Sequence, residues 1–202
     1  MAVSLRPRCE ACQRPTERCL CPLIPHLPHR CPVLVLQHTS ESRHALNTAR
    51  LAVLGLQQAQ LWVGESFSQL NAYLAAFRHP VLLFPGPEAQ TVEQWRAAQR
   101  EPDLLIVPDG TWRKARKILY ANPCLQELPR LQLNVAEASR YRVRKAPDAQ
   151  SLASIEAIAQ VLAELQPEQS YAALLRPFEQ LIEEQIAAMG AEVYARNYGG
   201  PS

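Results

Sequence analysis

From residue 33 onward, short apolar runs alternate with segments whose apolar residues recur at helical spacing. Continuous apolar runs between helices are typical of strands buried on both faces of a parallel sheet. The pattern therefore predicts an α/β fold, a parallel sheet with helices on both faces. The expected strands are 33–37, 60–63, 81–84, 104–107 and 131–133, and the expected helices are 45–58, 68–77, one capped by Thr91, 111–120, 151–165 and 171–189.

Polar residues gather where one expected strand ends and a basic helix begins. Leu104–Val107 is followed by Pro108, then Asp109-Gly110-Thr111-Trp112. In parallel sheets, ligands bind beyond the carboxyl ends of the strands. Gly110 permits a tight turn or a close backbone approach to a ligand. Asp109 is therefore expected either to cap the next helix or to project into the crevice.

Three further polar groups are candidates for a site, and each has a plainer structural explanation. Gln37–Thr48 follows the first strand, where His38 can equally be a satisfied, half-buried residue and Glu41 and Arg43 can serve as caps or surface pairs. Arginines alternate at 140, 142 and 144, so on an extended segment they share one face suited to phosphates, or form a solvated basic strand. The stretch 150–156 predicts a helix start with Ser151 as its cap and Ser154 in the first turn, and free N–H groups at such a start are also suited to hold a carboxylate.

Charge is distributed unevenly, although the net charge is only +2. Nine Lys or Arg residues lie between Arg113 and Lys145 against two acids, which favours a polyanion as partner over a membrane surface. No apolar run is long enough to cross a bilayer, and the N-terminus lacks the apolar core of a signal peptide, so we expect a cytoplasmic protein. Phosphate-loop, dinucleotide and zinc-protease motifs are absent from the sequence.

Four of the six cysteines cluster near the N-terminus as Cys9-x2-Cys12-x6-Cys19-x-Cys21. Four thiolates satisfy the tetrahedral preference of Zn2+ and leave no open position, so we expect a structural zinc site. His26, His29 or Cys31 are alternatives for one ligand. Prolines recur from 22 to 32, which predicts a zinc knuckle and stiff linker over 1–32, followed by a second unit over 33–202. Arginines surround the knuckle, so we expect it to contact the polyanion in addition to the basic segment 113–145.

Several of these motifs resemble the DTW-domain family. The resemblance is carried by Asp109–Trp112, 38–48, Leu83-Phe84-Pro85, 139–142 and 151–156, and the cysteines resemble those of bacterial members. One departure is Ala153-Ser154-Ile155-Glu156, where a threonine-containing S-T-x-E is expected. The resemblance covers nearly the whole chain.

The resemblance implies an activity, a fold and a cofactor. Members of the family are tRNA-uridine aminocarboxypropyltransferases, which move the 3-amino-3-carboxypropyl group of S-adenosylmethionine to N3 of a uridine and release methylthioadenosine. In bacterial members the uridine lies in the variable loop of tRNA. The implied fold is SPOUT-like, with a C-terminal trefoil knot around the cofactor. The implied partner is tRNA, with no membrane, no obligate protein partner, and a monomer or homodimer as the assembly.

The resemblance also places roles on residues. Asp109 is the candidate base or cofactor-orienting group, Thr111 a contact for the carboxylate of the transferred arm or for uracil, and Trp112 either a stacking surface or a buried helix residue. The expected cofactor residues are Pro85, Gly86, Asp109, Gly110, Leu133, Asn134, Ser151 and Leu152. The expected tRNA contacts are His38, Arg43, Lys114, Arg140, Arg142, Arg144 and Lys145. Competing hypotheses are a SPOUT-type RNA methyltransferase and a non-catalytic zinc-containing RNA-binding protein.

Overall fold

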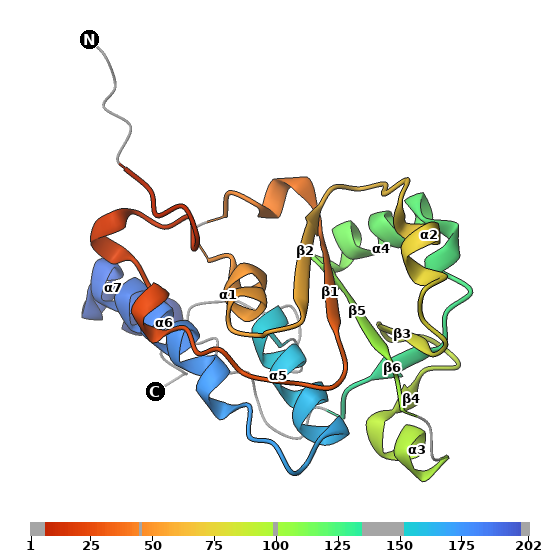
Figure 1. Ribbon diagram of the computed structural model, residues 1–202. Coiled ribbons are helices and arrows are strands. Elements are labelled where there is room, and N and C mark those ends of the chain that lie inside the picture. Colours follow the sequence, from red (N-terminus) through yellow and green to blue (C-terminus); the bar gives the residue numbers. More distant parts are fainter. Residues whose placement is uncertain (1–6, 45, 99–100, 135–151, 199–202) are drawn as a thin grey trace.

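A computed structural model describes residues 7–44, 46–98, 101–134 and 152–198. Its centre is one six-stranded sheet in which every neighbouring pair of strands is parallel, as the sequence predicts (Figure 1). The strand order is β2-β1-β5-β3-β6-β4. The strands are β1 (Val33–Gln37), β2 (Ala59–Val63), β3 (Pro80–Leu83), β4 (Gln90–Thr91), β5 (Leu104–Asp109) and β6 (Arg130–Gln132).

Helices cover both faces of the sheet, which confirms the predicted architecture (Figure 1). Alternation along β1 shows the two layers: Val33 and Val35 join one buried cluster, whereas Leu34 and Leu36 join the other. The first cluster includes residues of α1 (Thr48–Leu54), α3 (Val92–Ala97), α5 (Ser154–Leu165) and α6 (Arg176–Met189). The second includes residues of α2 (Leu70–Leu74) and α4 (Trp112–Ala121). A last helix, α7 (Ala191–Tyr198), follows α6.

One predicted helix start is confirmed by its cap, and two others lie elsewhere in the structure. Thr91 accepts a hydrogen bond from the Gln94 amide at 3.2 Å, and the Gln94 side chain returns the contact, so the predicted cap of α3 is confirmed. The start expected at Ser151 is wrong, because α5 begins at Ser154 with Ala153 as its N-cap. The expected long helix from 171 begins instead as a 3-10 turn, Ala172–Leu175, before α6.

The N-terminal segment packs on the flank of the sheet formed by α1 and α6 (Figure 1). Short 3-10 turns occupy Thr16–Arg18 and Cys21–Leu23, and Cys12 and Leu20 are buried in the same cluster as α6. Arg14 and Glu184 form an ion pair with an N–O distance of 2.5 Å across this contact. The remaining 3-10 turns in the described part are Thr39–Glu41 and Pro123–Leu125.

Two sequence-based expectations concern the chain's topology and its relation to a membrane. The expected trefoil knot depends on the path of residues 135–151 between β6 and α5, which lie outside the described residues, so the knot stays a prediction. Among the described helices, none combines the length and the apolar character needed to cross a bilayer.

Candidate active site and cysteine cluster

Two polar side chains meet at the carboxyl ends of the central strands β1 and β5. Gln37 and Asp109 are partners in the parallel register, and both point to the α1 and α5 face because they continue the odd-numbered positions of their strands. Gln37 Nε2 donates a hydrogen bond to Asp109 Oδ2 at 2.8 Å. Gln37 is fully buried, and Asp109 retains 9% of its surface exposed. The strand register therefore builds a buried amide and carboxylate pair.

A third group reaches the pair from the first residue of α5. Ser154 Oγ donates a hydrogen bond to Asp109 Oδ1, so both carboxylate oxygens accept a bond from a neutral side chain. The short motif 153–156 thus positions a hydroxyl that the sequence assigned only to a helix start. The buried Glu156 accepts the Ala153 amide at 2.8 Å and fixes the orientation of this first turn.

Asn47 connects the same pair to the start of α1. Its side chain exchanges hydrogen bonds with the Gln37 amide at 2.9 and 3.1 Å, and its oxygen also accepts the Arg50 amide at 3.1 Å as the N-cap of α1. The four side chains form a connected polar network, which we call the Asp109 network: Asn47, Gln37, Asp109 and Ser154.

Gly110 and the residues after it make the turn into α4. Gly110 has φ +151°, and a Cβ there would lie 2.9 Å from Lys114 Cβ, so only glycine fits without strain. Thr111 is the N-cap of α4 and accepts the Lys114 amide at 3.4 Å. The alternative of a buried Trp112 is wrong: it is 44% exposed, with its ring edge-on to Phe84 at a centroid distance of 5.6 Å. An exposed indole therefore stands beside the Asp109 turn.

His38 points to the opposite face and is held by protein groups on both ring nitrogens. Its Nε2 lies 2.8 Å from Glu65, and its Nδ1 accepts the Ser40 amide at 3.2 Å. Glu65 also pairs with Lys117 at 2.7 Å, and this contact lowers the pKa of Glu65. Lys114 pairs with Glu41 at 2.7 Å. Of the two residues expected to touch RNA here, His38 is buried and Lys114 is already paired, so the explanation as a satisfied histidine fits the structure.

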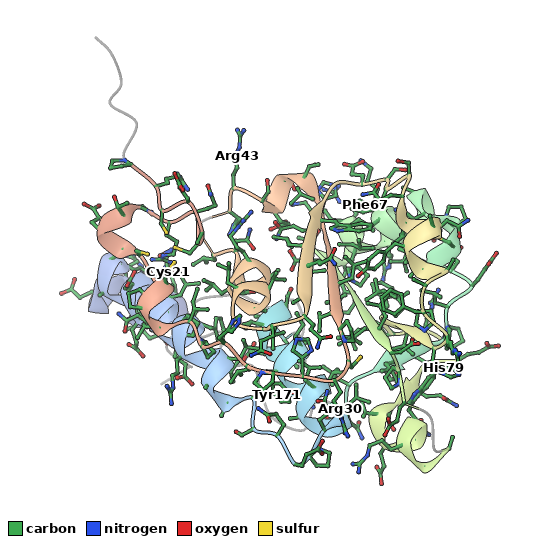
Figure 2. All side chains as sticks on the ribbon, viewed as in Figure 1. Cys21, Arg30, Arg43, Phe67, His79 and Tyr171 are labelled. Carbon is green, nitrogen blue, oxygen red and sulfur yellow. The ribbon has the colours of Figure 1, made fainter. Side chains whose placement is uncertain are left out.

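The other expected cofactor positions follow neighbouring strands. Pro85 and Gly86 come after β3, and Leu133 and Asn134 come after β6, so both segments share the carboxyl edge with Asp109. Leu152 lies just before α5 and is half-buried. Arg43, in the loop after β1, is exposed and projects outward (Figure 2). Five expected positions lie outside the described residues: Arg140, Arg142, Arg144, Lys145 and Ser151.

The four N-terminal cysteines converge, with their sulfur atoms all within 4.8 Å of one another. The Cys9–Cys21 and Cys12–Cys19 sulfur pairs are 3.5 and 3.8 Å apart, close to the edge of about 3.8 Å in a tetrahedron with Zn–S bonds of about 2.3 Å. Hydrogen bonds from the Cys12 and Ala11 amides lower the pKa of Cys9 to about 6, which favours a thiolate. The geometry is compatible with a metal ion.

The alternative ligands do not join this group. In the described part of the chain, the metal-compatible cluster contains the four cysteines and neither His26, His29 nor Cys31. His29 is occupied elsewhere: its Nδ1 lies 2.7 Å from the Cys31 carbonyl, and its Nε2 accepts the Gln58 amide at 3.0 Å. The Cys31 thiol is buried, which raises its pKa to about 12.

The protein is an α/β protein with a parallel sheet. It carries a buried polar network at the carboxyl ends of the central strands and a cluster of four cysteines near the N-terminus. Comparison with known families assigns it further: the model of the DTW domain matches residues 6–186. The chain belongs to the DTW-domain family. No solved structure matches it.

Several relatives carry an established name. The protein "tRNA-uridine aminocarboxypropyltransferase 2" of Drosophila melanogaster is 31% identical over 192 residues, covering 90% of this chain and 76% of that protein. The proteins of the same name from Macaca fascicularis and Mus musculus are 29% and 30% identical, and the match covers 90% of this chain but 64% of each of them. "tRNA-uridine aminocarboxypropyltransferase A" of Arabidopsis thaliana is 26% identical over 79% of this chain and 73% of its own length.

Proposed function

We propose that this protein is a tRNA-uridine aminocarboxypropyltransferase. The proposal rests on its membership of the DTW-domain family and on relatives of that name that match most of its length. The structural observation that supports the proposal is the Asp109 network. Its buried carboxylate belongs to the DTW motif and lies at the carboxyl edge of the sheet. The proposed target, N3 of a uridine in the variable loop of tRNA, is the finer part of the proposal.

The donor of the transferred group is S-adenosylmethionine, whose sulfonium makes the attached carbons electrophilic. A fixed carboxylate beside neutral donors suits a cationic ligand, because it supplies attraction at a defined place. Asp109 and Gly110, with the segments Pro85–Gly86, Leu133–Asn134 and 151–152, would hold the donor. Positioning of the long arm instead of the methyl group toward the nucleophile is the main catalytic task, since the sulfonium carries both.

We propose one of the two roles considered for Asp109. A general base must turn an oxygen toward the proton that it removes. Both Asp109 oxygens accept side-chain hydrogen bonds, from Gln37 and Ser154, which hold the carboxyl group in one orientation. We assign it to orientation of the sulfonium or the amine of the transferred arm. The exposed ring of Trp112, next to this turn, offers a stacking face for a base.

Two structural parts of the proposal accompany the enzyme function. The four cysteines hold a structural Zn2+, supported by sulfur spacings that suit a tetrahedron. The transferase unit is SPOUT-like, with a C-terminal trefoil knot around the cofactor. Arg43 and the basic residues Arg140, Arg142, Arg144 and Lys145 contact tRNA phosphates.

The experiment is nucleoside analysis of tRNA from a strain that lacks the gene, with rescue by the wild-type protein and by Asp109→Ala. We expect 3-(3-amino-3-carboxypropyl)uridine to disappear, to return with the wild type and to stay absent with Asp109→Ala. Mass spectrometry of tRNA incubated with the purified protein separates the rival: addition of one methyl group would show a methyltransferase instead. Binding of tRNA without release of methylthioadenosine would show a non-catalytic binding protein.

A further inference from the structure

A cavity of about 190 Å³ lies between the cysteine cluster, the loop after β1, and helices α1 and α6. Five arginines line it, from three separate stretches of chain, together with a single acid, Glu184. We call it the arginine cavity. Its arginines are Arg8, Arg14, Arg18, Arg43 and Arg50, and Figure 2 shows Arg43 and Cys21 on the same flank of the molecule.

The charge around this cavity is poorly balanced by protein groups. Guanidinium groups stay protonated, so the lining carries an excess of positive charge. Glu184 pairs with Arg14, and Arg8 donates to the Gln13 carbonyl at 2.8 Å. Among the described residues, no acid pairs with Arg18, Arg43 or Arg50. Such a concentration of like charge costs free energy, which a bound anion offsets.

Arg50 supplies an independent sign of a missing ligand. Its Nε is buried, yet it has no hydrogen-bond partner in the described part of the chain. Buried donors are nearly always satisfied, and an exception calls for an explanation by an unseen water, ion or ligand. An acceptor oxygen in the cavity would satisfy this donor. The backbone of Arg50 is anchored at the start of α1, since its amide donates to the Asn47 side chain at 3.1 Å.

We propose that the arginine cavity binds a backbone phosphate of the RNA substrate, at a site that adjoins the Asp109 network through Asn47. The cavity is small, which suits one phosphate group better than a whole nucleotide. Arg8, Arg18 and Arg43 are exposed at its rim, where they can follow the chain on either side of the bound phosphate. Planar guanidiniums match phosphate oxygens in pairs, whereas a lone carboxylate ligand would need fewer of them. This inference rests on the proposed function for the identity of the RNA.

One residue, Asn47, connects the arginine cavity to the Asp109 network by hydrogen bonds. Asn47 lines the cavity, and its side chain bonds to Gln37, which bonds to Asp109. A phosphate at Arg50 therefore fixes RNA on the same side of the sheet as the carboxylate. The cysteine cluster gains a role in this scheme, because it positions Arg8, Arg14 and Arg18 against α1.

The test measures binding of an unmodified tRNA transcript to full-length, zinc-loaded protein at several salt concentrations. Arg50→Gln should weaken binding about tenfold, as expected for one lost charge-assisted contact, and should lower the slope of log affinity against log salt by about 0.7 to 0.9. Arg96→Gln, on α3 and exposed, is the matched control and should retain both values. Wild-type affinity and slope in Arg50→Gln would overturn the proposal.

A second variant protects the test against misfolding. Arg18 lines the same cavity from the N-terminal segment and is exposed, so Arg18→Gln should fold normally and still weaken binding several-fold. If both arginines hold the same phosphate, the double variant should lose less than the sum of the two single losses. Fully additive losses would place them on different phosphates and would overturn a single site.

Kinetics separate this proposal from the proposed function. Arg50→Gln should raise the KM for tRNA more than it lowers kcat, measured by methylthioadenosine release. A raised KM for S-adenosylmethionine with unchanged RNA affinity would assign the cavity to the donor and overturn the proposal. If the wild-type protein releases no methylthioadenosine, the proposed function is refuted. A loss of RNA affinity in Arg50→Gln would still support RNA binding at the arginine cavity in that case.

Discussion

At the scale of single residues, Ser154 is the contact that joins α5 to the DTW motif. Its hydroxyl, the single polar group of the side chain, donates a hydrogen bond to Asp109. We expect Ser154→Ala to lower kcat by about 10- to 150-fold, because a hydrogen bond to a charged group contributes about 1.5 to 3 kcal/mol and each 1.4 kcal/mol is about a factor of ten. Methylthioadenosine release measures the loss. Ser68→Ala, at an exposed serine, is the control, and equal activity of the two variants would show that Ser154 has no part in positioning.

Gly110 is restricted by both its backbone angle and its surroundings. A methyl group there meets Lys114 Cβ at 2.9 Å, and φ +151° strains any other residue. We expect Gly110→Ala to lower the free energy of unfolding by about 1 to 3 kcal/mol, measured by urea denaturation. At Gly86 the added methyl would meet mainly the flexible end of Arg130, so Gly86→Ala should cost less. A larger loss of unfolding free energy in Gly86→Ala than in Gly110→Ala would contradict the conclusion that the turn at residue 110 requires glycine.

His29 makes the folded state sensitive to acid. Burial lowers its pKa, and its Nε2 must stay unprotonated to accept the Gln58 amide. The unfolded chain gains a proton below about pH 6.5, whereas the folded chain resists it, so the free energy of unfolding should fall as pH drops below about 6.5. Urea denaturation at pH 7.5 and 5.5 measures this fall. His29→Asn should reduce it, whereas the same replacement at the exposed His79 should leave it unchanged.

At the scale of elements, the cysteine cluster is the part whose structure depends on a ligand. Burial raises the pKa of Cys21 to about 12, and a bound Zn2+ would deprotonate such a thiol. We expect one zinc per chain by elemental analysis, and loss of that zinc in Cys19→Ser. Cys124→Ser, at a half-buried cysteine outside the cluster, should keep it. A wild-type protein without metal would refute the zinc proposal.

The elements that the sequence predicted well are those whose pattern decides their packing. The apolar run at β1 is found as expected, and Thr91 caps α3 because its side chain and that of Gln94 satisfy each other locally. The start of α5 was misplaced, since a serine at 151 is only one of several residues able to precede the helix. At α5, Ala153 is the cap and Glu156 supplies the missing side-chain contact.

At the scale of the whole molecule, the site depends on contacts that sequence spacing does not reveal. The sequence predicts Asp109 and Trp112 as site residues because both belong to the short motif Asp109-Gly110-Thr111-Trp112. Gln37 lies 72 positions from Asp109 and Ser154 lies 45 positions away, so only strand register and helix placement bring them together. The available signal was Gln37 itself, a polar residue that ends an otherwise apolar strand.

The composition of the chain predicts a boundary between two units at residue 32. We expect the residues on both sides of this boundary to unfold together. Leu20 is 1% exposed and belongs to the same buried cluster as α6. Leu20→Ala should therefore lower the free energy of unfolding of the whole molecule by about 2 to 5 kcal/mol. The fluorescence of Trp62 and Trp95, both beyond residue 32, reports this unfolding in urea. Leu23→Ala, at a side chain 40% exposed, is the control from the same segment and should change little. An unchanged tryptophan transition in Leu20→Ala would mean that the cysteine-rich segment folds as a separate unit, because the loss of its own core would then leave the sheet untouched.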